Sequence, residues 1–197
     1  MGNVIISGVI SKGGCQPFNA IEFYAVSEGA IGSTGDDWCE YQLLQQGGVS
    51  SDVVSNPPFR IDESPACSTP IVQGTFWRIT DDATAFSAYF GGVAADYEVA
   101  DLSLFDGTNI VDLNDSEGLL DRYGDNATVS WNYGDGWAYR DDGFNTGNEG
   151  AFVETNWSIN QDRVASCTTN DTCNCRFPLG TYSPTGTAEP PVCSPPT

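Results

Sequence analysis

The stretch that decides the fold reads Ser130-Trp131-Asn132-Tyr133-Gly134-Asp135-Gly136-Trp137-Ala138-Tyr139-Arg140. It holds two of the five tryptophans and two of the eight tyrosines of a 197-residue chain. Aromatic side chains contribute the largest areas to a buried core, and those of tryptophan and tyrosine also carry a polar atom that needs a hydrogen-bond partner. The segment is therefore either the centre of a folded core or an exposed platform for a ligand.

Three segments outside this stretch have the pattern of β-strands. Residues 4–10 are short and β-branched, which is typical of a buried strand. Residues 20–26 alternate between apolar side chains on one face and Glu22 and Tyr24 on the other. This alternation predicts a half-buried strand of an antiparallel sheet. Residues 74–80 alternate in the same way, so we expect a third strand there.

The rest of the body also predicts strands and turns. The pair Asp106-Gly107 separates the apolar runs 99–105 and 109–113, and such a pair is a strong hairpin signal because both positions need a positive φ. Residues 85–90 predict a further strand after an Asp-Asp turn, and residues 151–159 close the body. Helical periodicity of convincing length is missing from the sequence. Short strands with Gly and Pro turns predict a β-sandwich.

Two parts of the chain differ from this all-β body, which we expect over residues 1–163. Residues 27–73 are interrupted by Gly, Ser, Asp and Pro, and predict a loop-rich insert. Residues 164–197 hold four of the seven cysteines, and the last 20 residues hold six of the eleven prolines. This composition predicts a disulfide-tied Pro-rich tail or a linker.

The charge of the chain excludes several classes of function. There are 27 acidic groups against 7 basic ones, for a net charge of −20 and a pI near 4.1. Attraction to backbone phosphates needs cations, so we expect neither nucleic acid nor an anionic membrane as partner. The acidity suits solubility, divalent cations or a basic partner. Histidine is absent, which excludes Ser-His-Asp and Cys-His catalytic sites and histidine-ligated zinc.

Cysteines and glycosylation sequons suggest an oxidising, extracellular location. Cysteines in a Gly- and Pro-rich context predict disulfides in a secreted protein, and an odd number leaves one thiol free or paired with another chain. The spacing Cys-x2-Cys, which zinc favours, does not occur. Asn-x-Ser/Thr triplets accept glycans in secreted eukaryotic proteins and arise by chance in bacterial ones. The disulfide candidates are Cys15, Cys39, Cys67, Cys167, Cys173, Cys175 and Cys193, and the glycosylation candidates are Asn114, Asn126, Asn156 and Asn170.

One acidic motif resembles a calcium loop. Asp112, Asn114, Asp115 and Glu117 alternate oxygen ligands as calcium loops do. Glu117 stands where a helix-loop-helix calcium loop needs glycine, so the alternatives are an edge-of-sandwich or adventitious Ca²⁺ site and no site. Carboxylates are so abundant that the paired carboxylates of a glycosidase are expected by chance, and we do not expect an enzyme.

Arg140 ends the aromatic stretch among several aspartates. Its guanidinium could recognise a carboxylate or sulfate on a ligand. The alternative is an internal pair with Asp135, Asp141 or Asp142, with the guanidinium stacked on a neighbouring aromatic ring. With three aspartates this near in sequence, we expect the internal pair.

The segments above occur in an order that resembles the lamin-tail-like domain of secreted microbial proteins. Residues 4–7 and 19–24 are similar to a strand ending in "IS" followed by an "xAIELY" strand. Residues 99–112 resemble the family's "DDAIELYxxGxxVD" hairpin, and Gly124-Asp125 resembles its following "FG" turn. In the later part, residues 131–140 resemble "WxYxDGWAYR" and Asn156-Trp157 resembles the closing "xxNW". The likeness covers residues 4–26 and 74–159.

The resemblance implies an immunoglobulin-like β-sandwich. Such domains accompany extracellular nucleases, phosphatases and adhesins as binding or targeting modules, and carry no catalytic residues of their own. In this pattern the aromatic stretch is a structural core motif, made of Trp131, Tyr133, Trp137, Tyr139 and Arg140. Asp101-Leu102 departs from the family's "GDDAIEL", and the insert and tail have no family counterpart.

We therefore expect a secreted or cell-surface, non-catalytic structural or adhesion module. It would act by protein–protein binding or assembly, one form being a subunit of an extracellular filament or coat. The alternative is a carbohydrate-binding, lectin-like module whose exposed tryptophans stack on sugars, and a hydrolase is more distant. No cofactor is expected beyond the Ca²⁺ considered above. Other extracellular proteins, further copies of the chain, or glycans would be the partners, without membrane insertion.

Overall fold

The computed structural model is mostly β, as predicted. It describes residues 4–13, 16–26, 42–46, 59–60, 72–100, 102, 105–114, 118–125, 131–144, 151–160 and 167–186, with backbone alone for 42–46 and 59–60. Within these residues the strands form two sheets, accompanied by the helix α1 and by 3₁₀ turns at Glu154–Asn156 and Asn170–Thr172.

The larger sheet has six strands in the order β10-β9-β1-β2-β5-β6. Its strands are β10 (Trp157–Asn160), β9 (Trp137–Arg140), β1 (Val4–Ile10), β2 (Ala20–Ala25), β5 (Phe76–Thr80) and β6 (Tyr97–Glu98). Neighbours are antiparallel except β5 and β6, which are parallel. The smaller sheet consists of β4 (Phe59–Arg60), β3 (Gln42–Gln46), β7 (Ile110–Asn114) and β8 (Leu119–Tyr123), in that order.

Strand β1 lies in the middle of the larger sheet and is irregular at one position. It pairs with β2 on one side and β9 on the other, and a bulge falls between Ile6 and Gly8. A bulge shifts the alternation of side chains by one residue. Ile6 and Val9 consequently face one hydrophobic cluster, while Ile5 and Ile10 face another. Both faces of β1 are buried, in agreement with its β-branched sequence.

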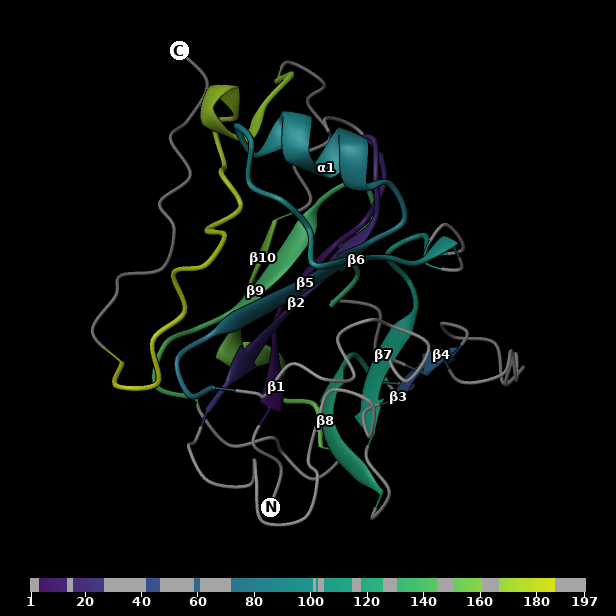
Figure 1. Ribbon diagram of the computed structural model, residues 1–197. Coiled ribbons are helices and arrows are strands. Elements are labelled where there is room, and N and C mark those ends of the chain that lie inside the picture. The colour runs from purple at the N-terminus through teal and green to yellow at the C-terminus, as the bar shows by residue number, and fades with distance from the viewer. Residues whose placement is uncertain are drawn as a thin grey trace.

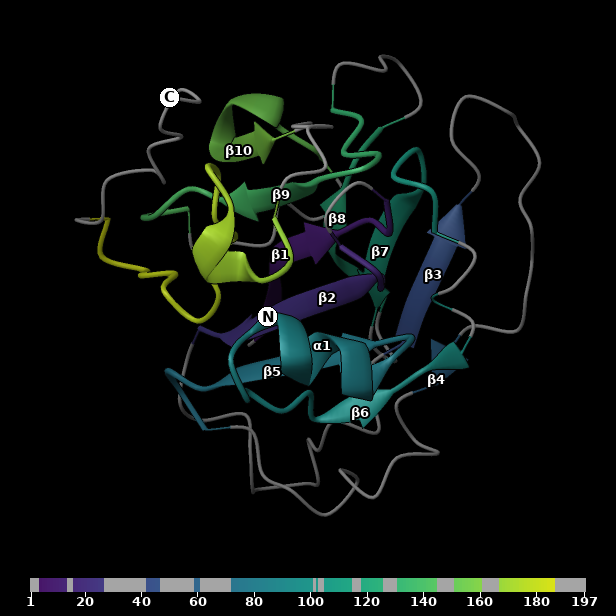
Figure 2. The ribbon, with the colours of Figure 1, turned by 90° about the horizontal axis from the view of Figure 1, so that it is seen from above.

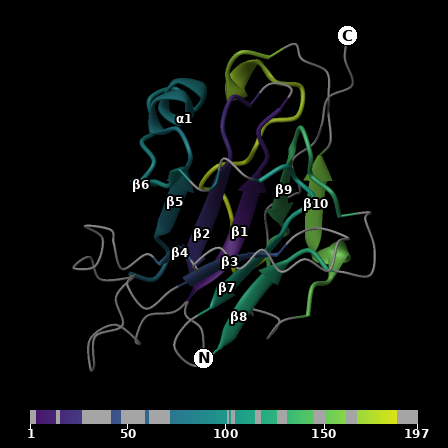
Figure 3. The ribbon, with the colours of Figure 1, turned by 90° about the vertical axis from the view of Figure 1, so that its right-hand side faces the viewer.

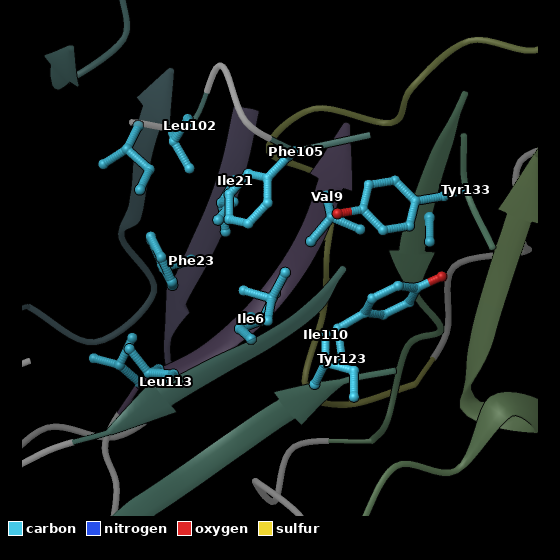
Figure 4. Close-up of a cluster of buried hydrophobic side chains, with 14 of the residues drawn as sticks. Ile6, Val9, Ile21, Phe23, Leu102, Phe105, Ile110, Leu113, Tyr123 and Tyr133 are labelled. Carbon is cyan, nitrogen blue, oxygen red and sulfur yellow. The ribbon is translucent and has the colours of Figure 1, made fainter. Parts of the chain in front are cut away.

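The first cluster, which we call the inner cluster, fills the space between the two sheets. Figure 4 shows Ile110, Leu113 and Tyr123 of the smaller sheet facing Ile6 and Phe23 of the larger one. Two sheets that share one core in this way have the layered arrangement of a β-sandwich.

The second cluster, the outer cluster, covers the opposite face of the larger sheet. Its side chains come from β1, β2 and β9 below, and from α1 and the C-terminal segment above. In Figure 1 the smaller sheet lies to the right of the larger sheet, and the yellow C-terminal segment lies to its left. Figures 2 and 3 show the same layering from above and from the side, with α1 over one end of the larger sheet. The larger sheet is therefore the middle of three layers.

Residues 177–183, which we call the C-terminal cover, belong to this third layer. Phe177 is 2% and Tyr182 4% exposed. Phe177 packs so closely on Gly8 that a Cβ there would overlap its ring, and the Tyr182 ring lies edge-on to Tyr24 with centroids 4.9 Å apart. A few large aromatic rings thus suffice to attach a segment that is poor in apolar residues to the sheet.

Residues 83–89 form a helix instead of the predicted strand. α1 (Ala83–Tyr89) begins after Asp82, whose side chain accepts a hydrogen bond from a first-turn N–H. Phe86 and Tyr89, three residues apart, are buried in the outer cluster together with Phe90. This spacing of three and four is helical, but the run is too short for the period to stand out in the sequence.

Ala85 N donates to Asp82 Oδ1 at 2.8 Å. We expect Asp82→Ala to lower the free energy of unfolding by about 1 kcal/mol, because this N–H at the start of α1 loses its acceptor. Urea unfolding measures the change. Asp82→Asn keeps an acceptor oxygen and is expected to stay within a few tenths of a kcal/mol of the parent. Equal losses in the two variants would contradict the capping role.

The predicted hairpin around Asp106-Gly107 is wrong. The turn itself forms, with Gly107 at φ 84° and Asp106 Oδ1 accepting from Thr108 N. Both edges of β7, however, are occupied by β3 and β8, so β7 has no edge left for the predicted partner. The expected loop-rich insert, residues 27–73, supplies β3 and β4, and local turn chemistry could not show that a distant segment takes the partner position.

Candidate functional site

The aromatic stretch joins the two clusters. Trp131 and Tyr133 lie in the inner cluster, while Trp137 and Tyr139 of β9 lie in the outer one. Trp131 Nε1 donates to Asp125 Oδ1 at 3.2 Å, and Trp137 Nε1 donates to a backbone carbonyl of the C-terminal segment at 3.3 Å. All four rings are at most 3% exposed, so they form core and not an exposed platform.

Arg140 ends this stretch inside the protein. Its Nη2 pairs with Asp121 Oδ2 of β8 at 2.5 Å, and the two side chains are 1% and 0% exposed. Arg140 Nε donates to Ile6 O at 2.8 Å, and Ile6 N donates to Asp121 Oδ2 at 2.8 Å. The guanidinium also lies over the Trp157 ring, 4.5 Å from its centroid. The ion pair thus takes up both backbone groups of Ile6, where β1 is no longer paired with β9.

The prediction that Arg140 pairs with a neighbouring aspartate and ring is corrected by this geometry. β9 directs Arg140 toward the inner cluster, where β8 supplies Asp121 from 19 residues earlier in the chain. Burial raises the pKa of Asp121, and Arg140 opposes that shift. Asp121 Oδ1 and Arg140 Nη1 are buried without a hydrogen-bond partner, as is the hydroxyl of Tyr182. A pair this deeply enclosed holds the two sheets together and is closed to an external ligand.

Glu22 forms a second buried polar centre, on the opposite face of the larger sheet. Its side chain is 2% exposed in the middle of β2. Glu22 Oε1 accepts from Ser7 Oγ and from Tyr139 OH, both at 3.1 Å. Glu22 Oε2 accepts from Arg78 Nε at 3.0 Å and from Gly180 N of the C-terminal cover at 2.9 Å. Four donors from four segments therefore meet on one carboxylate.

The electrostatics of Glu22 are unusual for a glutamate. Burial raises its pKa from 4.5 to about 6, against the opposing effects of Arg78, Tyr139 and Ser7. The expectation that β2 is half-buried is wrong, since every residue of the strand is buried. Glu22 does lie on the face opposite Phe23, as the alternation predicts, but the C-terminal cover encloses that face.

Two of the four calcium candidates, Asp112 and Asn114, lie within the described residues. Both oxygens of Asp112 bind Arg122, with Nε–Oδ1 2.5 Å and Nη2–Oδ2 2.7 Å. Asn114 ends β7, and its Nδ2 is buried without a partner. Asp115 and Glu117 lie outside the described residues. Among the residues that are described, no group of three or more cysteines and carboxylates could hold a metal.

The glycosylation candidates occupy different surroundings. Asn170 Oδ1 accepts from Phe177 N at 2.8 Å and its Nδ2 donates to Phe177 O at 3.0 Å, so this amide anchors the C-terminal cover. Asn156 is part of a 3₁₀ turn and Asn114 ends β7, while Asn126 lies outside the described residues. Glycosylation of these positions stays a prediction.

Three of the seven cysteines are described. Cys167 and Cys173 form a disulfide around the 3₁₀ turn Asn170–Thr172, and Cys175 is disulfide-bonded as well. The hydroxyl of Tyr89, in α1, lies 2.9 Å from Cys173 Sγ and is its hydrogen-bond donor, since a disulfide sulfur carries no proton. These bonds fix the segment that precedes the C-terminal cover. The other cysteine candidates, Cys15, Cys39, Cys67 and Cys193, lie outside the described residues.

Sequence reasoning predicted an internal ion pair for Arg140 but missed its partner Asp121, and it missed Glu22 as a buried centre. For Glu22 a signal exists: a carboxylate within an apolar strand, opposite Arg78 on a strand that carries the other charge, indicates an internal pair. For Asp121 no signal exists, because it is one of 12 acidic residues between Asp96 and Asp142.

A lectin would need exposed tryptophans, but the four described tryptophans are buried. Trp77, Trp131, Trp137 and Trp157 are each at most 6% exposed, and Trp38 lies outside the described residues. Within the described part of the chain, the only α-helix is too short to cross a membrane. No family model, no curated protein and no solved structure matches the chain significantly.

Proposed function

We propose that this chain is a secreted, non-catalytic structural or adhesion module that acts by binding other proteins or further copies of itself. The observation that carries the proposal is that most of the described side chains suited to binding a small ligand are buried in the fold and not displayed in a site. Among the described residues, most side chains that commonly bind ligands, namely aromatic rings and guanidinium groups, are buried among themselves or paired with buried carboxylates. Phe144 and Arg176 are the exposed exceptions. Arg140 and Trp157, which lie against each other, are the strongest example.

The charged side chains exposed among the described residues are mainly carboxylates, with Lys12 and Arg176 as the cations. Asp82, Glu98, Asp106 and Asp171 are exposed among the described residues. With a net charge of −20, a basic protein surface would be attracted at long range, and this attraction weakens with added salt.

Two further observations support the finer parts of the proposal. The segments that resemble a lamin-tail-like domain are neighbours in space, since Trp157 pairs with Arg140 across β10 and β9. This contact favours an immunoglobulin-like sandwich of that type. The disulfide between Cys167 and Cys173 favours an oxidising, extracellular location.

Native mass measurement and light scattering test this proposal. We expect species heavier than the 21.0 kDa monomer as concentration rises, or capture of a basic probe protein such as lysozyme at low salt. Comparing samples with and without reductant shows whether an unpaired cysteine links the copies. A monomer at every concentration that also ignores the basic probe would contradict the proposal, and a signal on a glycan array would replace it with the lectin alternative.

A further inference from the structure

Three backbone N–H groups of the C-terminal cover make polar contacts that converge on one carboxylate. Gly180 N donates directly to Glu22 Oε2. Thr181 N and Tyr182 N donate to the hydroxyl of Tyr139 at 3.2 and 2.8 Å. That hydroxyl has one proton, which it donates to Glu22 Oε1. The N–H groups of 180 and 182 thus end on Glu22 or on the tyrosine hydroxyl bound to it, and that of Thr181 is shared between this hydroxyl and Pro178 O at 3.1 Å.

Opening the cover would change the surroundings of Glu22 in a definable way. Arg78 faces Glu22 in register on β5, while Ser7 and Tyr139 reach it from β1 and β9. These three donors belong to the sheet and would stay. The cover itself supplies one N–H, from Gly180, and the exclusion of water from the carboxylate. Closing the cover therefore mainly desolvates a group that the sheet already binds.

We propose that the C-terminal cover is a proton-linked lid, which closes more tightly when Glu22 takes up a proton and loosens when Glu22 is ionised. The lid stays joined to the protein through the disulfide-bonded segment before it. Its opening would uncover the aromatic outer face of β1, β2 and β9, which Phe177 and Tyr182 now fill.

The direction of the pH dependence follows from the two states of Glu22. In the closed state burial raises its pKa to about 6, whereas an open carboxyl in water beside Arg78 is expected at 4.5 or below. The closed state thus binds the proton more tightly than the open state. Closure gains its full advantage below pH 4.5 and loses it as pH rises through 6.

Asp96, which accepts from Arg78 N at 2.7 Å, is a second carboxyl near this site, and burial raises its pKa. The groups that contact Glu22 directly do not titrate in this range. They are Arg78 from β5 and Tyr139 from β9, with Tyr182 nearby on the cover, while Ser7 of β1 is neutral. Arginine and tyrosine side chains keep their charge between pH 4.5 and 7.5. Asp142 is a carboxylate that contacts the cover at another place, where its Oδ1 accepts from Ser183 N at 2.7 Å.

Hydrogen exchange at the Tyr182 amide, corrected for its intrinsic rate, measures lid opening. Between pH 7.5 and pH 5 we expect the opening constant to fall about eightfold, from pKa values of 6 closed and 4.5 open. The exchange rate of the Ile21 amide, in β2, reports pH effects on global unfolding, which are subtracted from the rate of Tyr182. In Glu22→Gln the pH dependence of Tyr182 should vanish, whereas Asp142→Asn should retain it.

A second measurement keeps the test independent of any variant. In the unaltered protein, the ¹³C shift of the Glu22 side-chain carboxyl should titrate with a midpoint near 6. A midpoint at or below 4.5 would overturn the inference, as would an equal pH response of Tyr182 in Glu22→Gln. Neither result depends on whether the protein assembles or binds a basic partner.

Discussion

Replacing Arg140 by methionine is expected to lower the free energy of unfolding by about 3–5 kcal/mol, because the carboxylate of Asp121 would remain buried without its cation. Ile6 O would lose its donor in the same step. For a chain of this size such a loss lowers Tm by roughly 10 °C. Thermal unfolding followed by circular dichroism, together with urea titration, measures both quantities.

An exposed ion pair of the same kind provides the matched control. Arg176 pairs with Asp171 at 3.4 Å, and the two side chains are 60% and 84% exposed. Arg176→Met should change stability by no more than about 0.5 kcal/mol, since water and salt screen such a pair. The double variant Asp121→Leu with Arg140→Met removes both charges and should recover part of the loss. Similar melting of Arg140→Met and Arg176→Met would contradict the structural role of the buried pair.

Gly107→Ala is expected to cost about 3–5 kcal/mol, because two separate effects act at one residue. Its φ of 84° is unfavourable for a residue with a Cβ. A Cβ at this position would also overlap the backbone of Gly134 in the aromatic stretch, where Tyr133 N donates to Gly107 O at 3.0 Å. Rigid backbone cannot move aside as a side chain can.

Gly74→Ala separates these two effects. Gly74 has nearly the same φ, 81°, but a Cβ there would meet no atom within 4 Å. Its substitution should therefore cost only about 1 kcal/mol, from the backbone conformation alone. Chemical denaturation of both variants gives the difference. Equal losses would mean that the approach of Gly107 to Gly134 contributes nothing to stability.

The elements that the sequence predicts correctly are those whose pattern is local. Residues 4–10, 20–26 and 74–80 read as strands, and β1, β2 and β5 lie within them, because alternation and β-branching are properties of the segment itself. The faces of β2 are also predicted, with Phe23 toward the inner cluster and Glu22 away from it.

The wrong predictions concern the tertiary neighbours of a segment, which come from elsewhere in the chain. The half-buried assignment of β2 failed because its cover comes from residues 177–183, more than 150 positions later. The hairpin at Asp106-Gly107 failed because β3 occupies the edge of β7 that a hairpin partner would need. Arg140 was expected beside a sequence neighbour, whereas the strand turned it toward Asp121. Each of these outcomes depends on a distant segment, about which a single sequence carries no direct information.

The central position of β1 has a consequence for how the chain reaches its native state during synthesis. Strand β1 leaves a ribosome well before β9, because Arg140, which binds Ile6, follows it 134 residues later. At typical elongation rates this interval lasts on the order of ten seconds, in which one edge of an apolar strand has no partner. The β1–β2 hairpin can form early, but closing both sheets must wait for β9. Secretion before folding, or a chaperone that shields this edge, would protect the chain from aggregation in that interval.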